Sequence, residues 1–369
     1  MLVSLIRHFG VDHASKLFVL YATQDFFLVD GKKLPIVTAL PRWVNKLFLQ
    51  WSKSSLWGIR WLFDYRNLMF FYPLLCWLLR RKIQQAAPSH LVISSFATAK
   101  NVVPAYWWHI PTTLYVHSPM QYIWENFDEY MGKLTGMKRQ LFRVAAGYLR
   151  PRDKQPRVYT TIYANSSYTA RCVEKYYALS AKIRYPQLDK LFSSTPAVEQ
   201  PRTYFLYIWR LVRFIREVDR VITLCNTLQL PLLVAWSWPD EAYLQSIAWP
   251  TITFVWHIWN TEEKIAIMKH ARWLINLAKE SCGIATMEAL SLGVPVFGYA
   301  QWGSREIVAR DETQDDLQGS SIVSPYWVLV QDKSPQSVVQ GMQLFVQQPR
   351  ERKKIQQDMQ MWSTTHIHY

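Results

Sequence analysis

The chain alternates short apolar runs with helix-like segments along most of its length, and this alternation most limits its possible folds. In the first half, strands are predicted at 90–95, 112–116 and 161–165, followed by a helix at 169–177. Residues 186–202 contain three prolines and little periodicity, which predicts a linker. Strands that alternate with helices form parallel sheets, so the pattern predicts an α/β protein.

The same alternation resumes after the linker. Its predicted strands cover 204–208, 231–235, 252–255, 273–276 and 294–299, and its predicted helices cover 218–227, 262–270, 286–292, 334–345 and 351–361. We therefore expect two Rossmann-like, doubly wound domains facing across a cleft. Ligands of such sheets bind at the carboxyl ends of the strands.

The positive charge of the chain lies in one half. Residues 1–200 hold 26 Lys and Arg against 11 Asp and Glu, whereas residues 201–369 hold 16 of each. The four cysteines have no zinc-like or disulfide-framework spacing, which suits a reducing compartment. No nucleic-acid-binding motif accompanies the basic residues, so nucleic acid is not an expected partner.

The most apolar segment, 67–79, precedes Arg80, Arg81 and Lys82. It is interrupted by Pro73 and is shorter than the roughly 20 residues that span a bilayer. Two interpretations stay open: a buried core helix, which we favour, and an interfacial helix with a basic flank. The sequence thus predicts a cytoplasmic protein, either soluble or peripheral on a membrane.

Two carboxylates, Glu280 and Glu288, bracket a predicted strand-to-helix turn. Gly283 lets backbone amides approach a ligand, and the N-terminus of the helix that follows favours an anion. Glu280 is explained about equally well by the preference of acids for helix N-termini. Upstream, Arg210 directly follows a predicted strand, where a guanidinium can grip a diphosphate. A solvated surface arginine is the alternative.

These residues carry a resemblance that extends over about 30–360. It includes Arg210-Leu-Val, Arg216, Glu280-x7-Glu288, Gly293-Val-Pro-Val, Gly303-Ser-Arg-Glu306, Tyr115-Val-His117-Ser-Pro-Met120, Ala164-Asn165-Ser166, Tyr176-Tyr177 and Tyr185-Pro186. In this order they resemble the retaining glycosyltransferases of family 4, which have the GT-B fold. Within the family, the chain most resembles mannosyltransferases of surface-polysaccharide assembly.

The resemblance implies a role for each matching residue. Glu280 would contact the donor sugar, Glu288 the nucleotide ribose, and Gly283, Ile284 and Gly303 the donor nucleotide. Arg210 and Arg216 would hold the diphosphate, although Arg216 stands where the family usually has Lys. His117 would lie near the transferring sugar, whereas a lone histidine is otherwise more often structural. The family needs no metal or cofactor, and no nucleophile is assigned.

The implied domains are an acceptor-binding domain 1–187, a linker 188–202, a nucleotide-sugar domain 203–345 and a C-terminal helix 346–369 packing back toward the first domain. The implied activity moves a hexose, with mannose favoured, from a GDP- or UDP-linked donor to a glycan or polyprenyl-diphosphate-linked acceptor. Two alternatives are a catalytically dead scaffold or membrane-associated partner and, more weakly, a nucleotide-sugar epimerase of the same fold.

A lipid-linked acceptor would give the basic half a use at the inner face of the plasma membrane. Seven basic residues would attract anionic headgroups there: Lys138, Arg139, Arg143, Arg150, Arg152, Lys154 and Arg157. The alternative for any one of them is an ordinary solvated surface residue.

Two departures from the family stand out. Members of the family begin with a strand and a Gly-rich loop that opens the first helix. This sequence begins inside what resembles that helix, at 1–10, which predicts an N-terminal truncation. Tryptophan stands at glycine positions of the family at 209, 236, 238, 256, 302 and 327, and the chain has 18 Trp against 12 Gly. An indole strains a backbone chosen for glycine. We therefore hypothesise that UGA encodes glycine in this gene, which UGG codons at those positions would exclude.

Overall fold

The computed structural model describes residues 5–6, 9–10, 15–22, 24–52, 71–96, 98–105, 108–199, 203–208, 217–235, 241–255, 258, 260–309, 321–323, 327–332, 334–347 and 351–367. The chain divides into two compact units. The first contains 1–165 and 169–183, and the second contains 166–168 and 184–369.

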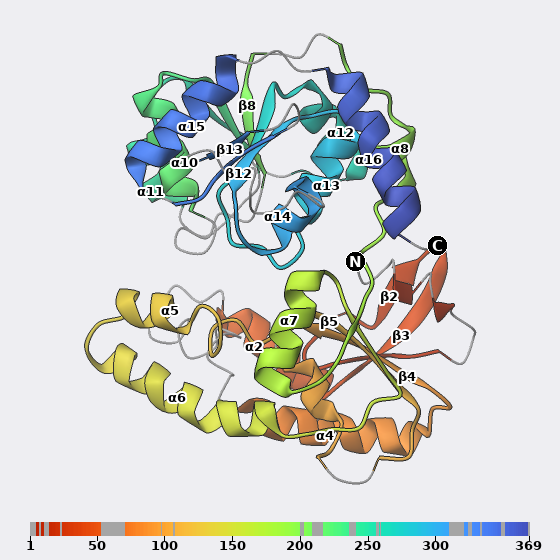
Figure 1. Ribbon diagram of the computed structural model, residues 1–369. Helices are drawn as coiled ribbons and strands as arrows, with labels where there is room; N and C mark the ends of the chain where they lie inside the picture. The colour runs from red at the N-terminus through yellow and green to blue at the C-terminus, as the bar shows by residue number, and fades with distance from the viewer. Residues whose placement is uncertain are drawn as a thin grey trace. The chain divides into compact units, whose positions relative to one another are not determined.

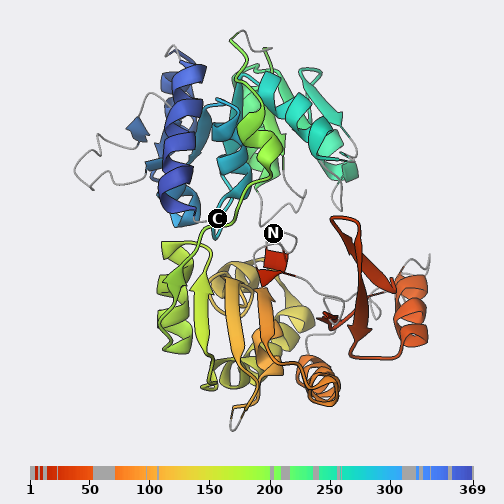
Figure 2. The same cartoon turned by 90° about the vertical axis from the view of Figure 1, so that its right-hand side faces the viewer.

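The first unit holds two sheets and the helices that cover them. Its described elements are β1 (Leu17–Val19), β2 (Phe26–Val29), β3 (Lys32–Thr38), α2 (Arg42–Ser52), α4 (Tyr72–Ala86), β4 (Leu91–Phe96), the 3-10 helix η2 (Ala99–Val102), β5 (Thr112–Ser118), α5 (Phe127–Lys133), α6 (Gly136–Lys154), β6 (Thr161–Ala164), α7 (Ser167–Tyr177), whose first two residues belong to the second unit, and β7 (Lys182–Ile183). Figure 2 shows β2, β3 and α2 together at one side of this unit.

The main sheet of the first unit has the order β4-β5-β6-β7 and is parallel throughout. All seven residues of β5 are buried, as expected of a central strand covered on both faces. The predicted strands at 90–95, 112–116 and 161–165 correspond to β4, β5 and β6, with small shifts at their ends. The alternation of apolar runs and helix-like segments in the sequence therefore predicted β4, β5 and β6 of this sheet, but not β7.

The second unit contains one larger sheet. Its described elements are α8 (Lys190–Ser194), β8 (Phe205–Ile208), α10 (Val218–Thr227), β9 (Leu232–Ala235), α11 (Glu241–Ile247), β10 (Ile252–Val255), α12 (Thr261–His270), β11 (Trp273–Asn276), α13 (Ile284–Ser291), β12 (Val296–Tyr299), α14 (Trp302–Ala309), β13 (Ser321–Val323), β14 (Trp327–Val330), α15 (Pro335–Gln347) and α16 (Arg352–His366). Figure 1 shows α10, α11 and α15 on one side of this sheet and α12, α13 and α16 on the other.

The seven strands run in the order β10-β9-β8-β11-β12-β14-β13, parallel except for the edge strand β13. From β10 to β14 this is the doubly wound order in which the strand sequence reverses between β8 and β11. Ligands of such sheets bind at that reversal, beyond the carboxyl ends of the strands. The sheet therefore directs attention to the loops that follow β8 and β11.

The predicted linker contains a short helix. Asp189 accepts a hydrogen bond from the Leu191 amide and begins α8. Trp327, one of the tryptophans at family glycine positions, is the first residue of the regular strand β14, pairs with Val296 and is 2% exposed. The other tryptophans matched to family glycines lie outside the described residues, except for the backbone of Trp302.

The segment 67–79 is described only from Phe71 onward. There α4 buries Leu75, Cys76 and Leu79 against the first unit while Leu74 and Trp77 remain exposed. This agrees with the favoured core helix. Among the described residues, no helix combines the length and apolar character needed to cross a bilayer.

Candidate functional site

The candidate site of the second unit begins at Asn276, the last residue of β11, which is 1% exposed. Its side-chain amide donates to Glu280 Oε2 at 3.1 Å and to Thr286 Oγ1 at 3.0 Å. Its Oδ1 accepts from the Ala278 amide at 3.1 Å. One buried side chain thus ties the strand end, the Glu280 carboxylate and the first turn of α13 together.

Gly283 forms the entrance to α13. Its φ of +75° lies in the left-handed region, which side chains with a Cβ rarely adopt. Its carbonyl accepts from the Met287 amide at 3.0 Å, so the helix begins with Ile284. The unpaired amides of a first helical turn attract anions. The predicted strand, glycine turn and helix are all present in this order.

Gly303 on α14 lies against the same loop. Its amide donates to the Glu280 carbonyl at 2.9 Å. A Cβ at this position would come within 1.9 Å of the Ser281 carbonyl oxygen. Such an approach is possible only for glycine, so Gly303 fixes the loop between Glu280 and Gly283 by backbone contact.

Glu288 lies on α13, which is buried from Ala285 to Ser291, and pairs with Lys264 of α12. Burial raises the pKa of Glu288, Lys264 opposes that rise, and Glu280 adds to it. The repulsive influence of Glu280 means that the two carboxylates share one electrostatic environment. Lys264 was missed in the sequence because a single lysine in an exposed-looking helix carries no spacing signal.

Glu306 of α14 was noted only as a landmark, yet it makes several contacts. Its carboxylate accepts from the Ser167 amide at 2.8 Å, the Tyr168 amide at 3.1 Å and the Tyr185 hydroxyl. The neighbouring Ser166 hydroxyl donates to the Ser281 carbonyl at 2.5 Å. All these residues belong to the second unit. The loop 280–283 is therefore held by α14 and by the segment 166–168.

His117 belongs to the first unit, near the end of β5. Its Nε2 lies 2.7 Å from Ser94 Oγ, and its backbone carbonyl accepts from Asn165 Nδ2 at 2.9 Å. Burial lowers the pKa of His117 to about 4, so the ring is neutral near pH 7. Its buried Nδ1 has no hydrogen-bond partner. This atom can pair with a ligand hydroxyl.

The structure brings five predicted site residues together in the second unit: Glu280, Gly283, Ile284, Glu288 and Gly303. It places His117 in the first unit. Arg210 and Arg216 lie outside the described residues, so their diphosphate role stays a prediction. The described chain contains no group of three or more His, Cys, Asp and Glu residues arranged to hold a metal.

Two of the basic residues predicted to attract headgroups instead have internal roles. Arg157 is 7% exposed and donates to the carbonyls of Val103, Gln155 and Arg152. Arg150 donates to the Ile123 carbonyl at 2.7 Å and lies over the Phe127 ring. Their guanidinium groups satisfy backbone oxygens where chain segments meet.

No protein-family model and no curated protein matches the chain. Solved structures share its fold. The chain aligns over 96% of its length with 84% of sucrose-phosphate synthase from Thermosynechococcus elongatus, at 12% identity and a TM-score of 0.64. For WaaG, a glycosyltransferase involved in lipopolysaccharide biosynthesis, the shares are 98% and 90%, at 14% identity and 0.58. For Anabaena HepE, in complex with UDP and glucose, they are 91% and 83%, at 10% identity and 0.52. The expected α/β fold of the GT-B class is confirmed.

Proposed function

We propose that the chain is a glycosyltransferase which moves a hexose from a nucleotide-diphospho-sugar to a glycan or lipid-linked acceptor. The observation that carries the proposal is the pair Glu280 and Glu288 beside the N-terminus of α13, at the reversal of a doubly wound sheet. Solved structures of the same fold include an enzyme in complex with UDP and glucose. Retention of anomeric configuration, metal independence and a mannose-like sugar are parts of this proposal.

Each residue has a physical task in the proposed reaction. Glu288 accepts hydrogen bonds from the ribose hydroxyls, and Glu280 accepts one from the donor sugar. The amides at Gly283 and Ile284 face the negative donor, for which the start of a helix is suited. Arg210 and Arg216 neutralise the charge that develops on the leaving diphosphate, which is electrostatic catalysis and needs no metal ion.

His117 serves as a neutral hydrogen-bonding group in this proposal. With its pKa lowered to about 4, it is not a proton donor at neutral pH. Its unpaired Nδ1 orients a sugar hydroxyl, while Ser94 and the backbone contacts of β5 hold the ring in place. The acceptor lies at a cytoplasmic membrane surface, and an anionic bilayer is therefore included among the proposed partners.

Donor hydrolysis and transfer across a panel of UDP- and GDP-sugars test the proposal, with Glu280→Gln as the variant. The change removes the charge that faces the sugar, and we expect kcat/KM to fall by about 100-fold, the effect typical of losing one well-placed electrostatic contact. Glu262→Gln, on the exposed side of α12, is the control and should leave kcat/KM unchanged.

The products also separate the alternatives. Donor hydrolysis or transfer with net retention supports the proposal. An altered sugar still attached to its nucleotide would instead identify an epimerase. Unaltered donors throughout the panel, with no nucleotide binding by calorimetry, would contradict the proposal in favour of a catalytically dead scaffold.

A further inference from the structure

Helix α6 has an unusual outer face. At 19 residues it is about 28 Å long, and it runs along the outside of the first unit (Figure 1). It is attached through Ala145, Ala146, Leu149 and Asp153, which are buried. These positions share one face of the helix, leaving the remaining surface for solvent or for another partner.

An apolar stripe occupies part of that remaining surface. Met137 is 78% exposed, Leu141 44%, Val144 64% and Tyr148 37%. Their spacing of four, three and four residues places them in one line along the helix. A helix exposed to water normally carries polar side chains on its outer face. The stripe therefore indicates a surface that is covered in the working protein.

The charges around the stripe are of one sign. Helix α6 contains six basic residues and a single acid, Asp153, which is buried. At 100° per residue, Arg152 lies about 50° from the middle of the stripe on one side, and Arg143 and Lys154 lie about 110–130° from it on the other; all three are exposed. Long basic side chains beside an apolar stripe can extend toward headgroups while the stripe enters the lipid.

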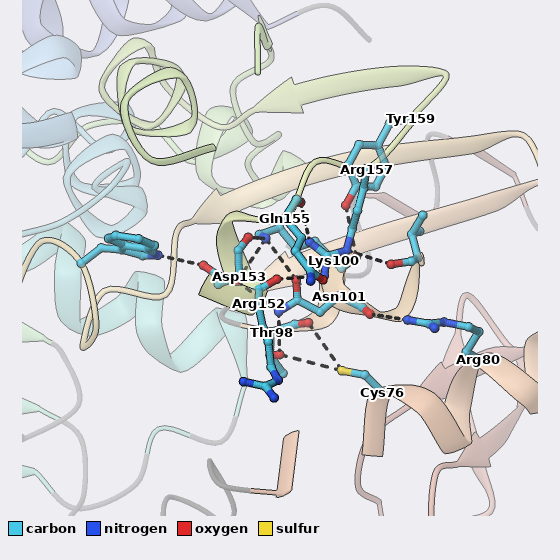
Figure 3. A network of polar contacts seen from close by, with 12 residues as sticks. Cys76, Arg80, Thr98, Lys100, Asn101, Arg152, Asp153, Gln155, Arg157 and Tyr159 are labelled. Atoms are coloured by element: carbon cyan, nitrogen blue, oxygen red, sulfur yellow. Dashed lines mark hydrogen bonds and ion pairs between the residues drawn. The ribbon is translucent and has the colours of Figure 1, made fainter. Parts of the chain in front are cut away.

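The attachment of α6 is rigid because its last turn takes part in a buried polar network (Figure 3). Lys100 Nζ lies 3.1 Å from Asp153 Oδ1, and Trp124 Nε1 donates to Asp153 Oδ2 at 2.8 Å. Asn101 donates to the same carboxylate at 3.1 Å. The outer face is thus presented on a fixed helix and needs no folding when it binds.

We propose that the outer face of α6 docks the first unit onto an anionic lipid bilayer, with the stripe in the interface and the flanking cations on the headgroups. A polyanion alone would use the cations but leave the stripe in water, so a bilayer fits both features. The inference rests on the proposed function for its context, a lipid-linked acceptor, whereas the docking surface is defined by α6 itself.

Flotation with vesicles of phosphatidylcholine, with and without 30 mol% phosphatidylglycerol as a chosen composition, tests the proposal. We expect the full chain to bind the anionic vesicles, more weakly as salt rises. Met137→Ser with Val144→Ser should weaken binding at least about 10-fold, since each loses an exposed apolar contact. Arg143→Gln with Lys154→Gln should weaken it by a similar factor on anionic vesicles only.

Met361→Ser is the matched control, because Met361 is 66% exposed on α16 of the neutral second half. Its vesicle binding should equal that of the original chain. Unaltered binding by both double variants, or no binding by the original chain, would overturn the proposal. So would a dimer, measured by sedimentation without vesicles, that the apolar variant alone dissociates, because the stripe would then contact a second copy.

Donor hydrolysis and transfer to a water-soluble acceptor, measured on the same variants, keep the two proposals apart. Both double variants should hydrolyse donor at the original rate, since none of the four residues lies in the candidate site. Vesicle binding without any glycosyl transfer would contradict the proposed function and leave the docking surface standing. Glycosyl transfer without vesicle binding would support the proposed function and contradict the docking surface.

Discussion

The two units bury their ion pairs to different depths. In the first unit, the side chains of Lys100 and Asp153 are 3% and 0% exposed, and Arg80 and Arg157 donate to nearby carbonyls (Figure 3). In the second unit, the side chains of Lys264 and Glu288 are 22% and 10% exposed, a continuous apolar cluster fills the interior, and the site loop is held by the close backbone contact of Gly303. The net charge of a half of the chain is therefore a poor measure of the charge on its surface.

The largest expected effect comes from removing the carboxylate of the buried network in the first unit. Asp153→Asn leaves Lys100 buried without an anion, and breaking such a pair by removing one partner costs about 3–5 kcal/mol. We expect the free energy of unfolding in urea to fall by this amount. Asp128→Asn, on the exposed first turn of α5, should change it by less than about 0.5 kcal/mol. Equal effects of the two changes on the free energy of unfolding would show that the buried carboxylate contributes no more to stability than an exposed one.

In the second unit, the test adds a side chain at Gly303, where its backbone lies against the backbone of Ser281. Gly303→Ala forces a methyl group against the Ser281 carbonyl and displaces the Glu280 loop. A displacement of about 1 Å in a site costs on the order of 100-fold in rate, so kcat/KM for donor hydrolysis should fall by that factor. Gly132→Ala on α5 meets no atom within 4 Å and should leave kcat/KM unchanged. Full activity in Gly303→Ala would mean that the loop is not held by this contact.

The smallest expected effect concerns the charged pair beside the apolar cluster. Because burial raises the pKa of Glu288, its ionisation costs stability above the pKa of the unfolded chain, and the cost disappears as the pH falls below it. Lys264→Met removes the opposing cation and raises that pKa further. We expect a loss of about 2 kcal/mol in unfolding free energy at pH 7, diminishing toward about pH 4.

Thermal and urea unfolding at both pH values measure this difference. Lys354→Met, exposed on α16, is the control and should show no comparable dependence on pH. A loss that stays constant between the two pH values would indicate that Lys264 acts by packing and not through the ionisation of Glu288.

Local patterns in the sequence predicted most strands of the two larger sheets and the turn from Glu280 through Gly283 to Glu288, because each depends on neighbours along the chain. The three-stranded sheet of β1, β2 and β3 and the strands β7, β13 and β14 were not predicted. Contacts between distant segments were not predictable in this way. Lys264 pairs with Glu288 from another helix. Glu306 accepts hydrogen bonds from the amides of Ser167 and Tyr168, which precede it in the chain by 139 and 138 positions. Arg157 was interpreted as a surface cation because sequence does not reveal which carbonyls surround a side chain.

The assignment of residues 166–168 to the second unit has a consequence for how such proteins can be divided or recombined. A fragment that began after the last strand of the first unit would carry Glu306 without the Ser167 and Tyr168 amides that it accepts from. Exchange of the whole second unit between proteins of this fold must therefore transfer two separate stretches of the chain. A single crossover at the linker would join a loop and a carboxylate that were never selected together.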